Sequence, residues 1–391
     1  MMFTVIKVLK NIRHSFIDLF IFAMISLSTR PAKDIRPKSI LIIRLDAIGD
    51  YVLFRNFIEV LRKSSDYRDY RITLLGNVVW RSLGEELDSG YVDEFIWLDR
   101  DRFVADFAYR SEKLKEINNP GYEIVLSPVY SRGFVYSDMI VRLVNAKHKI
   151  GSEGGLSNML KWQKRRGDRY YTRLIPARDG VLFEFDRNKE FFEGFLQVRL
   201  DLQKPTIVPP KRECPFELPR RYAVLFIGAS SRFRKWSIAG FAKIAGRLKD
   251  AYGYEIVLCG GPGDRDDAEE FARRFGSGFL DLVGKTSLVE LVSVLHNGSL
   301  MVSNETSAPH LALALGMKEV VVIYNGDHFG RFTPYPEDRA PNYHAIYHPE
   351  IGNDVEAYTK KSNAYGYRNN LDMGAISLDM VEAAIDKVLT K

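Results

Sequence analysis

Residues 40–50 read Ile-Leu-Ile-Ile-Arg-Leu-Asp-Ala-Ile-Gly-Asp, and Tyr-Val-Leu-Phe follows. A short apolar run, a glycine-containing turn and a helical pattern predict a buried parallel strand that leads into a helix. In an open α/β sheet the carboxyl ends of the strands line the ligand crevice. We therefore expect Asp50 at a site of chemistry, where it stays ionised because a helix start favours an anion. The alternative is that Asp50 only caps the helix.

The same alternation continues through a chain of 391 residues, which is too long for one ordinary core. Strand patterns alternate with helical patterns, the first of which is Tyr51–Arg62, and this predicts parallel sheets. Residues 203–220 contain several prolines together with lysines and predict a linker. The predicted strands are Ser39–Leu45, Arg71–Leu75, Glu94–Leu98, Tyr122–Pro128, His148–Gly151, Tyr222–Ile227, Glu255–Cys259, Phe279–Val283, Leu300–Ser303 and Val320–Tyr324.

Composition narrows the class of partner. The net charge of +6 and the pI near 9.0 favour an anionic partner such as a nucleotide, a phospholipid surface or a phosphorylated glycan. Two cysteines cannot build a disulfide framework or a cysteine zinc site. His344 and His348 lack a third ligand, so no metal site is predicted.

The N-terminal segment is strongly apolar from Phe3 to Leu27, with Lys7, Lys10 and Arg13 in its first half. Its uninterrupted apolar part, Leu19–Leu27, is shorter than the roughly 20 residues of a membrane span. We expect residues 1–35 to form an amphipathic helix on a membrane surface, with its basic residues toward anionic headgroups. The alternative is a helix packed on the protein's own core.

Two glycine-containing loops follow strands of the second half. In the first, Gly228 permits a close backbone approach, Ser230 and Ser231 can donate to phosphate oxygens, and Lys235 can neutralise them. A solvated basic loop is the alternative. In the second, Gly261 belongs to a Cys-Gly-Gly-Pro-Gly turn that can admit an adenine or a ribose, although a plain tight turn explains it equally well.

A third segment begins a helix after the strand that ends at Ser303. Thr306 and Ser307 lie where free backbone N–H groups bind a diphosphate. The carboxylate of Glu305 suits sugar hydroxyls. His310 either contacts the ligand or is a helix histidine with a partner inside the protein.

A basic and aromatic stretch, Lys161–Arg173, interrupts the alternation. It includes Arg166, Arg169 and Arg173, with Trp162, Tyr170 and Tyr171 among them. It is a candidate surface for an anionic acceptor, with an exposed loop as the alternative. The basic composition also suggests nucleic-acid binding as a function. No recognised nucleic-acid module appears, so no nucleic-acid partner is expected.

Three segments together resemble the family 9 glycosyltransferases, the bacterial ADP-heptose:lipopolysaccharide heptosyltransferases. Residues 40–50 are similar to the family's strand and Gly-Asp turn, and residues 228–236 to its phosphate loop. Residues 281–316 contain Asp-Leu-Val-Gly-Lys-Thr-Ser-Leu-Val-Glu-Leu, similar to "D-L-x-G-K-T-S-L-x-E-L". They end in Ser-Asn-Glu-Thr-Ser-Ala-Pro-His-Leu-Ala-Leu-Ala-Leu-Gly, similar to "S-N-D-T-G-P-x-H-L-A-A-A-L-G".

The resemblance implies a GT-B fold, in which two Rossmann-like doubly wound α/β domains face a central cleft. Residues 36–202 would bind the acceptor and residues 221–391 the nucleotide sugar. It implies an inverting, metal-independent transfer without a cofactor, with Asp50 as general base and Gly49 beside the acceptor.

The family's donor contacts fall on Ser230, Ser231, Lys235, Glu305, Thr306 and Ser307. Gly261 and His310 are further donor-binding candidates from their own segments. The expected donor is ADP-heptose or a similar nucleotide sugar, and the acceptor a lipopolysaccharide-core or other anionic surface glycolipid. The expected location is the inner face of the cytoplasmic membrane.

Departures from the family pattern leave a second function open. Glu305 stands for an Asp and Ser307 for a Gly, and both changes alter the sugar subsite. Residues 324–328, Tyr-Asn-Gly-Asp-His, replace the family's frequent "F-G-P-T-D-P". A protein that kept the fold as a glycan- or nucleotide-binding module and lost turnover is therefore the alternative to an enzyme.

Overall fold

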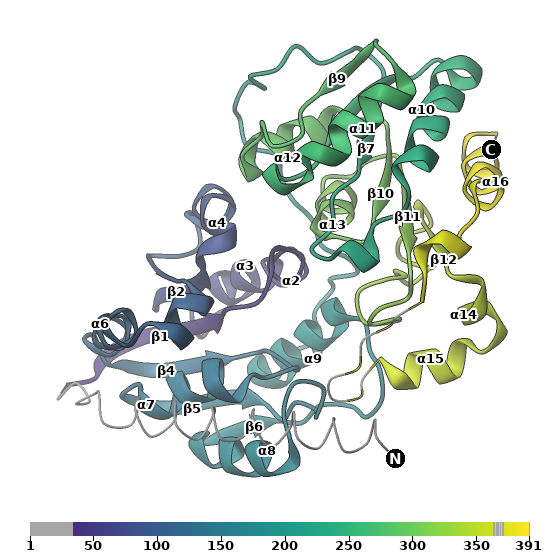
Figure 1. Cartoon of the computed structure of the whole chain (residues 1–391). Helices are drawn as coiled ribbons and strands as arrows, with labels where there is room; N and C mark the ends of the chain where they lie inside the picture. Colours follow the sequence, from purple (N-terminus) through teal and green to yellow (C-terminus); the bar gives the residue numbers. More distant parts are fainter. Residues whose placement is uncertain (1–33, 363, 365–366, 368, 370, 391) are drawn as a thin grey trace.

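The computed structural model describes residues 34–362, 364, 367, 369 and 371–390, which form two α/β domains (Figure 1). The predicted amphipathic segment, residues 1–35, lies almost wholly outside this part of the chain. Among the described residues, no helix combines the length and the apolar character that a membrane crossing requires.

The N-terminal domain is a parallel six-stranded sheet in the order β3-β2-β1-β4-β5-β6. The central strand β1 pairs with β2 on one side and β4 on the other, which buries its apolar run completely. The strands are β1 (Arg36–Arg44), β2 (Arg71–Asn77), β3 (Glu94–Leu98), β4 (Tyr122–Ser127), β5 (Ala146–Ser152) and β6 (Arg173–Ile175). The helices are α2 (Ile48–Val52), α3 (Asn56–Lys63), α4 (Arg81–Asp88), α5 (Arg100–Ala105), α6 (Phe107–Asn118), α7 (Met139–Leu143), α8 (Lys161–Gly167) and α9 (Glu184–Leu196).

The C-terminal domain is a second parallel six-stranded sheet, in the order β12-β11-β10-β7-β8-β9. The strands are β7 (Tyr222–Phe226), β8 (Glu255–Cys259), β9 (Phe279–Asp281), β10 (Leu300–Asn304), β11 (Glu319–Tyr324) and β12 (Tyr343–Tyr347). The helices are α10 (Ile238–Tyr252), α11 (Arg265–Phe275), α12 (Leu288–Asn297), α13 (Ser307–Ala314), α14 (Pro349–Asn353), α15 (Val355–Lys361) and α16 (Leu378–Leu389). Single helical turns of the C-terminal domain lie at Arg232–Arg234, Pro262–Asp264 and Met373–Ala375. Those of the N-terminal domain lie at Val78–Trp80, Phe134–Asp138 and Asp168–Tyr170.

The predicted doubly wound class is confirmed, and each predicted strand has a counterpart. Residues 203–220 contain no helix or strand and separate the two sheets. The predicted helix Tyr51–Arg62 is in fact two helices, α2 and α3, because the chain turns between Leu53 and Arg55. The apolar period runs on through this turn, so the pattern did not reveal it. The edge strands β6 and β12 and the helices α8, α14 and α15 were not predicted.

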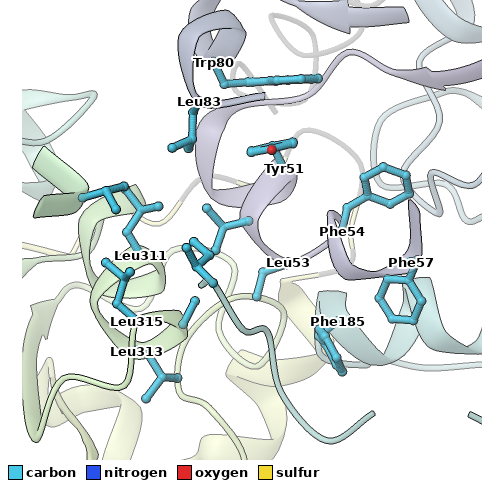
Figure 2. Close-up of a cluster of buried hydrophobic side chains, with 14 of the residues drawn as sticks. Tyr51, Leu53, Phe54, Phe57, Trp80, Leu83, Phe185, Leu311, Leu313 and Leu315 are labelled. Atoms are coloured by element: carbon cyan, nitrogen blue, oxygen red, sulfur yellow. The ribbon is translucent and has the colours of Figure 1, made fainter. Parts of the chain in front are cut away.

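One apolar cluster joins the two domains (Figure 2). Side chains of α2 and α3, among them Tyr51 and Phe57, lie in the same buried cluster as Leu311, Leu313 and Leu315 around α13. Helix α2 packs directly on α13 at Gly49, where an added Cβ would lie 3.1 Å from Cδ2 of His310. A residue without a side chain therefore lets the two helices approach each other.

Polar contacts fix the linker and a second crossing point. Arg55 Nη1 donates to the carbonyl of Thr206 at 2.8 Å, and Asn56 both donates to and accepts from the Thr206 backbone. From the C-terminal domain, Arg339 forms a two-point ion pair with Asp186 of α9, at 2.6 and 2.7 Å.

We predict that Leu311→Ala lowers the free energy of unfolding by about 2–5 kcal/mol, because it opens a cavity in the cluster that joins the domains. Urea unfolding followed by circular dichroism measures the change. The matched control is Val208→Ala, a linker side chain that is 85% exposed and should change stability by less than about 0.5 kcal/mol. Equal effects of the two substitutions would show that the cluster does not stabilise the protein.

Candidate active site

A cavity of about 640 Å³ lies between the carboxyl ends of the two sheets and is lined by both domains. Eight of the residues predicted from the sequence line it together: Gly49, Asp50, Ser230, Gly261, Glu305, Thr306, Ser307 and His310. Five others, Ser231, Lys235, Arg166, Arg169 and Arg173, do not. The structure thus gathers the predicted base and most predicted donor contacts around one space.

Arg44, the last residue of β1, lies beneath Asp50 and has no exposed surface. Its guanidinium is 3.1 Å from Asp46, 3.2 Å from Glu184 and 3.7 Å from Asp50, and it also donates to Asn188 at 2.9 Å. One buried cation therefore faces three carboxylates. It compensates them only in part, which favours a protonated carboxyl group in the cluster.

The pKa of Asp50 is raised to about 7, first by burial and then by the charge of Asp46, while Arg44 and Arg331 act in the opposite direction. This differs from the expectation of a fully ionised carboxylate at a helix start. Helix α2 has only five residues, and the dipole of one turn is outweighed by the loss of solvation. The side chain of Asp50 keeps 22% exposure and lines the cavity, so a substrate can reach it.

Across the cavity, the start of α13 presents Thr306 and Ser307. Thr306 is the N-cap, and its Oγ1 accepts from the backbone N–H of Ala308 at 3.3 Å. His310, one turn further, is buried and its Nδ1 lies 2.8 Å from the hydroxyl of Tyr335. Burial, together with the charge of Arg234, lowers the pKa of His310 to about 4, so the imidazole is neutral at pH 7. His310 thus has an internal partner and also lines the cavity, and its contact with a ligand stays a prediction.

The two glycine-containing loops are joined through Asp264. Its Oδ2 accepts from the N–H of Gly261 at 2.8 Å, and a Cβ at Gly228 would lie 2.2 Å from the same oxygen. Lys235 reaches Asp264 and Asp267, each at 2.6 Å, instead of the cavity. The phosphate role of Lys235 therefore stays a prediction, and it would require these ion pairs to rearrange.

Glu305 is paired with a cation of the first loop. Its carboxylate forms an ion pair with Arg234, whose guanidinium also donates to the Ser230 hydroxyl at 3.2 Å. This arrangement brings a positive charge to the place where a donor diphosphate is expected.

The basic stretch Lys161–Arg173 forms α8, a helical turn and the edge strand β6. Arg166 contacts the Tyr170 hydroxyl at 3.1 Å, Arg173 donates to the Gly194 carbonyl at 3.1 Å, and Arg169 is exposed. The acceptor role of these arginines stays a prediction, since the structure places them outside the cavity.

Sequence reasoning missed Arg44, Glu184, Ser131 and Arg331, the last three of which line the cavity. A charged residue at the end of a strand that is otherwise apolar is a signal that points to Arg44. Glu184 and Arg331 lie in stretches whose pattern carries no such signal. Within the described ranges, no three side chains of His, Cys, Asp or Glu are grouped to hold a metal ion.

Two parallel six-stranded sheets that face one cavity with their carboxyl ends have the architecture of the GT-B fold. The chain belongs to glycosyltransferase family 9 (heptosyltransferase), whose family model matches residues 112–352. It is therefore a glycosyltransferase. Comparison with curated protein sequences gives no match.

Solved structures share this fold at low sequence identity. A family 9 glycosyltransferase from Veillonella parvula has a TM-score of 0.68 and 20% identity, over 92% of this chain and 99% of that one. E. coli heptosyltransferase WaaC with ADP has a TM-score of 0.66 and 16% identity, over 90% and 99%. E. coli ADP-heptose lps heptosyltransferase II has a TM-score of 0.58 and 18% identity, over 90% and 98%.

We predict that His310 stays neutral from pH 8 down to about 5, because its folded pKa is about 4. The unfolded chain binds this proton near pH 6.5, so the contribution of His310 to stability falls as the pH drops through the window between about 6.5 and 4. Imidazole ¹H–¹⁵N spectra over this range measure the titration, and His310→Gln identifies the signal. A midpoint at or above 6 would show that the imidazole is not buried as described.

Proposed function

We propose that this glycosyltransferase moves a sugar from a nucleotide-diphosphate donor to a glycolipid acceptor, with inversion and with Asp50 as general base. The observation that carries the proposal is the position of Asp50. It shares one cavity with the start of α13, and its pKa of about 7 suits a base that works near neutral pH.

The proposed reaction uses Asp50 on one wall of the cavity and the start of α13 on the other. The acceptor hydroxyl attacks the anomeric carbon on the side opposite the leaving diphosphate, so the new glycosidic bond forms as the bond to the phosphate oxygen breaks. Asp50 takes the hydroxyl proton late in this displacement. The departing diphosphate gains negative charge, which the N–H groups at Ser307 and the charge of Arg234 stabilise. These groups offer an alternative to a metal ion, in line with a transfer that needs no cofactor.

The proposed donor is ADP-heptose or a close relative. Support comes from membership in the heptosyltransferase family and from a structurally similar protein, E. coli WaaC, solved with ADP-2-deoxy-2-fluoro heptose at a TM-score of 0.62. The cavity volume of about 640 Å³ falls within the range of small-ligand sites.

The proposed acceptor is a lipopolysaccharide-core or other anionic surface glycolipid, met at the inner face of the cytoplasmic membrane. The net charge of +6 and the apolar, basic stretch of residues 1–30 support this placement.

We predict that Asp50→Asn lowers kcat/KM by about 10²–10⁴-fold, the usual contribution of a general base. In the unaltered enzyme, kcat/KM should rise with pH through about 7, because the carboxylate must be ionised to accept the proton. ADP release from ADP-heptose, with a core-glycolipid acceptor present, measures both.

The matched control is Asp46→Asn, four residues away. Asp46 raises the pKa of Asp50, so its neutralisation should move the acid limb of the profile to lower pH while activity persists. Full turnover by Asp50→Asn, or an acid limb below pH 5 in the unaltered enzyme, would contradict the base assignment.

We predict that deletion of residues 1–30 transfers the protein from the membrane pellet to the supernatant, because these residues carry the apolar surface that would enter the interface. Cell fractionation with immunodetection measures the distribution. Lys7, Lys10 and Arg13 changed together to Gln should give a partial shift in the same direction. Unchanged pelleting of the deleted chain would reject this membrane contact.

A further inference from the structure

Arg331 crosses from the C-terminal domain into the catalytic side of the cavity. It lies in the segment between β11 and β12, is 6% exposed, and donates from Nη2 to the hydroxyl of Ser131 at 2.6 Å. Ser131 belongs to the N-terminal domain, just after β4. The carbonyl of Arg331 accepts from the backbone N–H of Glu184 at 2.8 Å, so both ends of the residue are held by the opposite domain.

The turn that carries Arg331 is itself anchored in the C-terminal domain. The Thr333 hydroxyl lies 2.9 Å from the hydroxyl of Tyr343 on β12, and the Thr333 carbonyl accepts from Tyr324 on β11 at 3.2 Å. Arg331 must therefore move with the C-terminal domain. Asp50, Ser131 and Glu184 belong to the N-terminal domain, so the contacts of Arg331 with Ser131 and Glu184 cross the domain boundary.

The charges around Asp50 come from four places. Arg44 on β1, Asp46 after it and Glu184 on α9 all belong to the N-terminal domain, and Arg331 is the group contributed by the C-terminal domain. Arg100, Arg234 and the neutral His310 also line the cavity. Arg331 favours the ionised form of Asp50, whereas Asp46 and Glu184 oppose it. Within the N-terminal domain alone, two carboxylates that oppose the ionisation of Asp50 therefore stand against one arginine that favours it.

We propose that Arg331 is a positioning residue through which the C-terminal domain supports Asp50 as an ionised base. The guanidinium and the Asp50 carboxylate line the same cavity, so Arg331 adds a second cation to a cluster in which Arg44 alone faces three carboxylates. The base and one of the charges that support it therefore come from different domains. This inference rests on the proposed role of Asp50.

The test compares Arg331→Gln with Arg331→Lys in the full-length protein. The first removes the charge and keeps a donor for Ser131, and the second keeps the charge. For Arg331→Gln, the acid limb of kcat/KM should move to higher pH, and each unit of movement lowers the activity below the limb about tenfold. The loss measured at pH 6 should therefore exceed the loss at pH 8.5, and Arg331→Lys should restore the profile.

The matched control is Arg339→Gln. Arg339 lies in the same segment and also bridges the domains, but its guanidinium is paired with Asp186 and it does not line the cavity. Its loss should leave the acid limb in place. A uniform loss in Arg331→Gln at every pH, or an equal shift in Arg339→Gln, would overturn the inference, because either result indicates a purely structural contact.

A second readout needs no substrate and separates this inference from the proposed function. ¹³C NMR of carboxyl-labelled aspartate, with Asp50→Asn to identify the signal, gives the Asp50 midpoint directly. The midpoint should rise in Arg331→Gln and stay in place in Arg339→Gln. An unmoved midpoint refutes the inference even when Asp50→Asn is inactive, whereas an active Asp50→Asn enzyme refutes the proposed base.

Discussion

The approach of α2 to α13 is the constraint on which the site depends. Gly49 leaves room for His310, and the apolar cluster around Leu311 and Tyr51 holds the two helices together. This contact sets the base and the expected diphosphate site on facing walls of one cavity. Burial that stabilises the domain contact also removes water from around Asp50. The same packing therefore provides geometry and a raised pKa.

A surplus of negative charge around Asp50, within the N-terminal domain, is the second constraint on the site. Arg44 cannot balance three carboxylates, so burial and the remaining negative charge together raise the pKa of Asp50 to about 7. A better balanced cluster would leave Asp50 a weak base, and a cluster without Arg44 would leave the carboxylates without the cation that contacts all three. The C-terminal domain adds positive charge to the same cavity at Arg234 and Arg331.

The sequence predicted the parts of this protein that obey local rules. The buried strand before Asp50 and the helix start at Thr306 both carry their signal within a few residues. Short edge strands such as β6 were missed, since three residues hold too little pattern.

The unpredicted part of the site depends on contacts between distant segments. Glu184 and Arg331 reach the cavity from stretches about 150 residues apart, and nothing in either stretch indicates the other. The raised pKa of Asp50 was also unpredictable, because a helix start suggests ionisation and only the folded arrangement adds Asp46, Glu184 and burial. Lys235 is an example of a local signal that the fold changes. Its place in the loop suggests a phosphate contact, but its ammonium group forms ion pairs with Asp264 and Asp267.

The most direct test of the central claim is a crystal structure with an intact, unreactive nucleotide-sugar analogue such as ADP-2-deoxy-2-fluoro heptose. The account predicts the diphosphate at the start of α13, beside Thr306 and Ser307, with the anomeric carbon facing Asp50 across a space that fits one acceptor hydroxyl. A diphosphate bound away from α13, or an anomeric carbon turned away from Asp50, would contradict it.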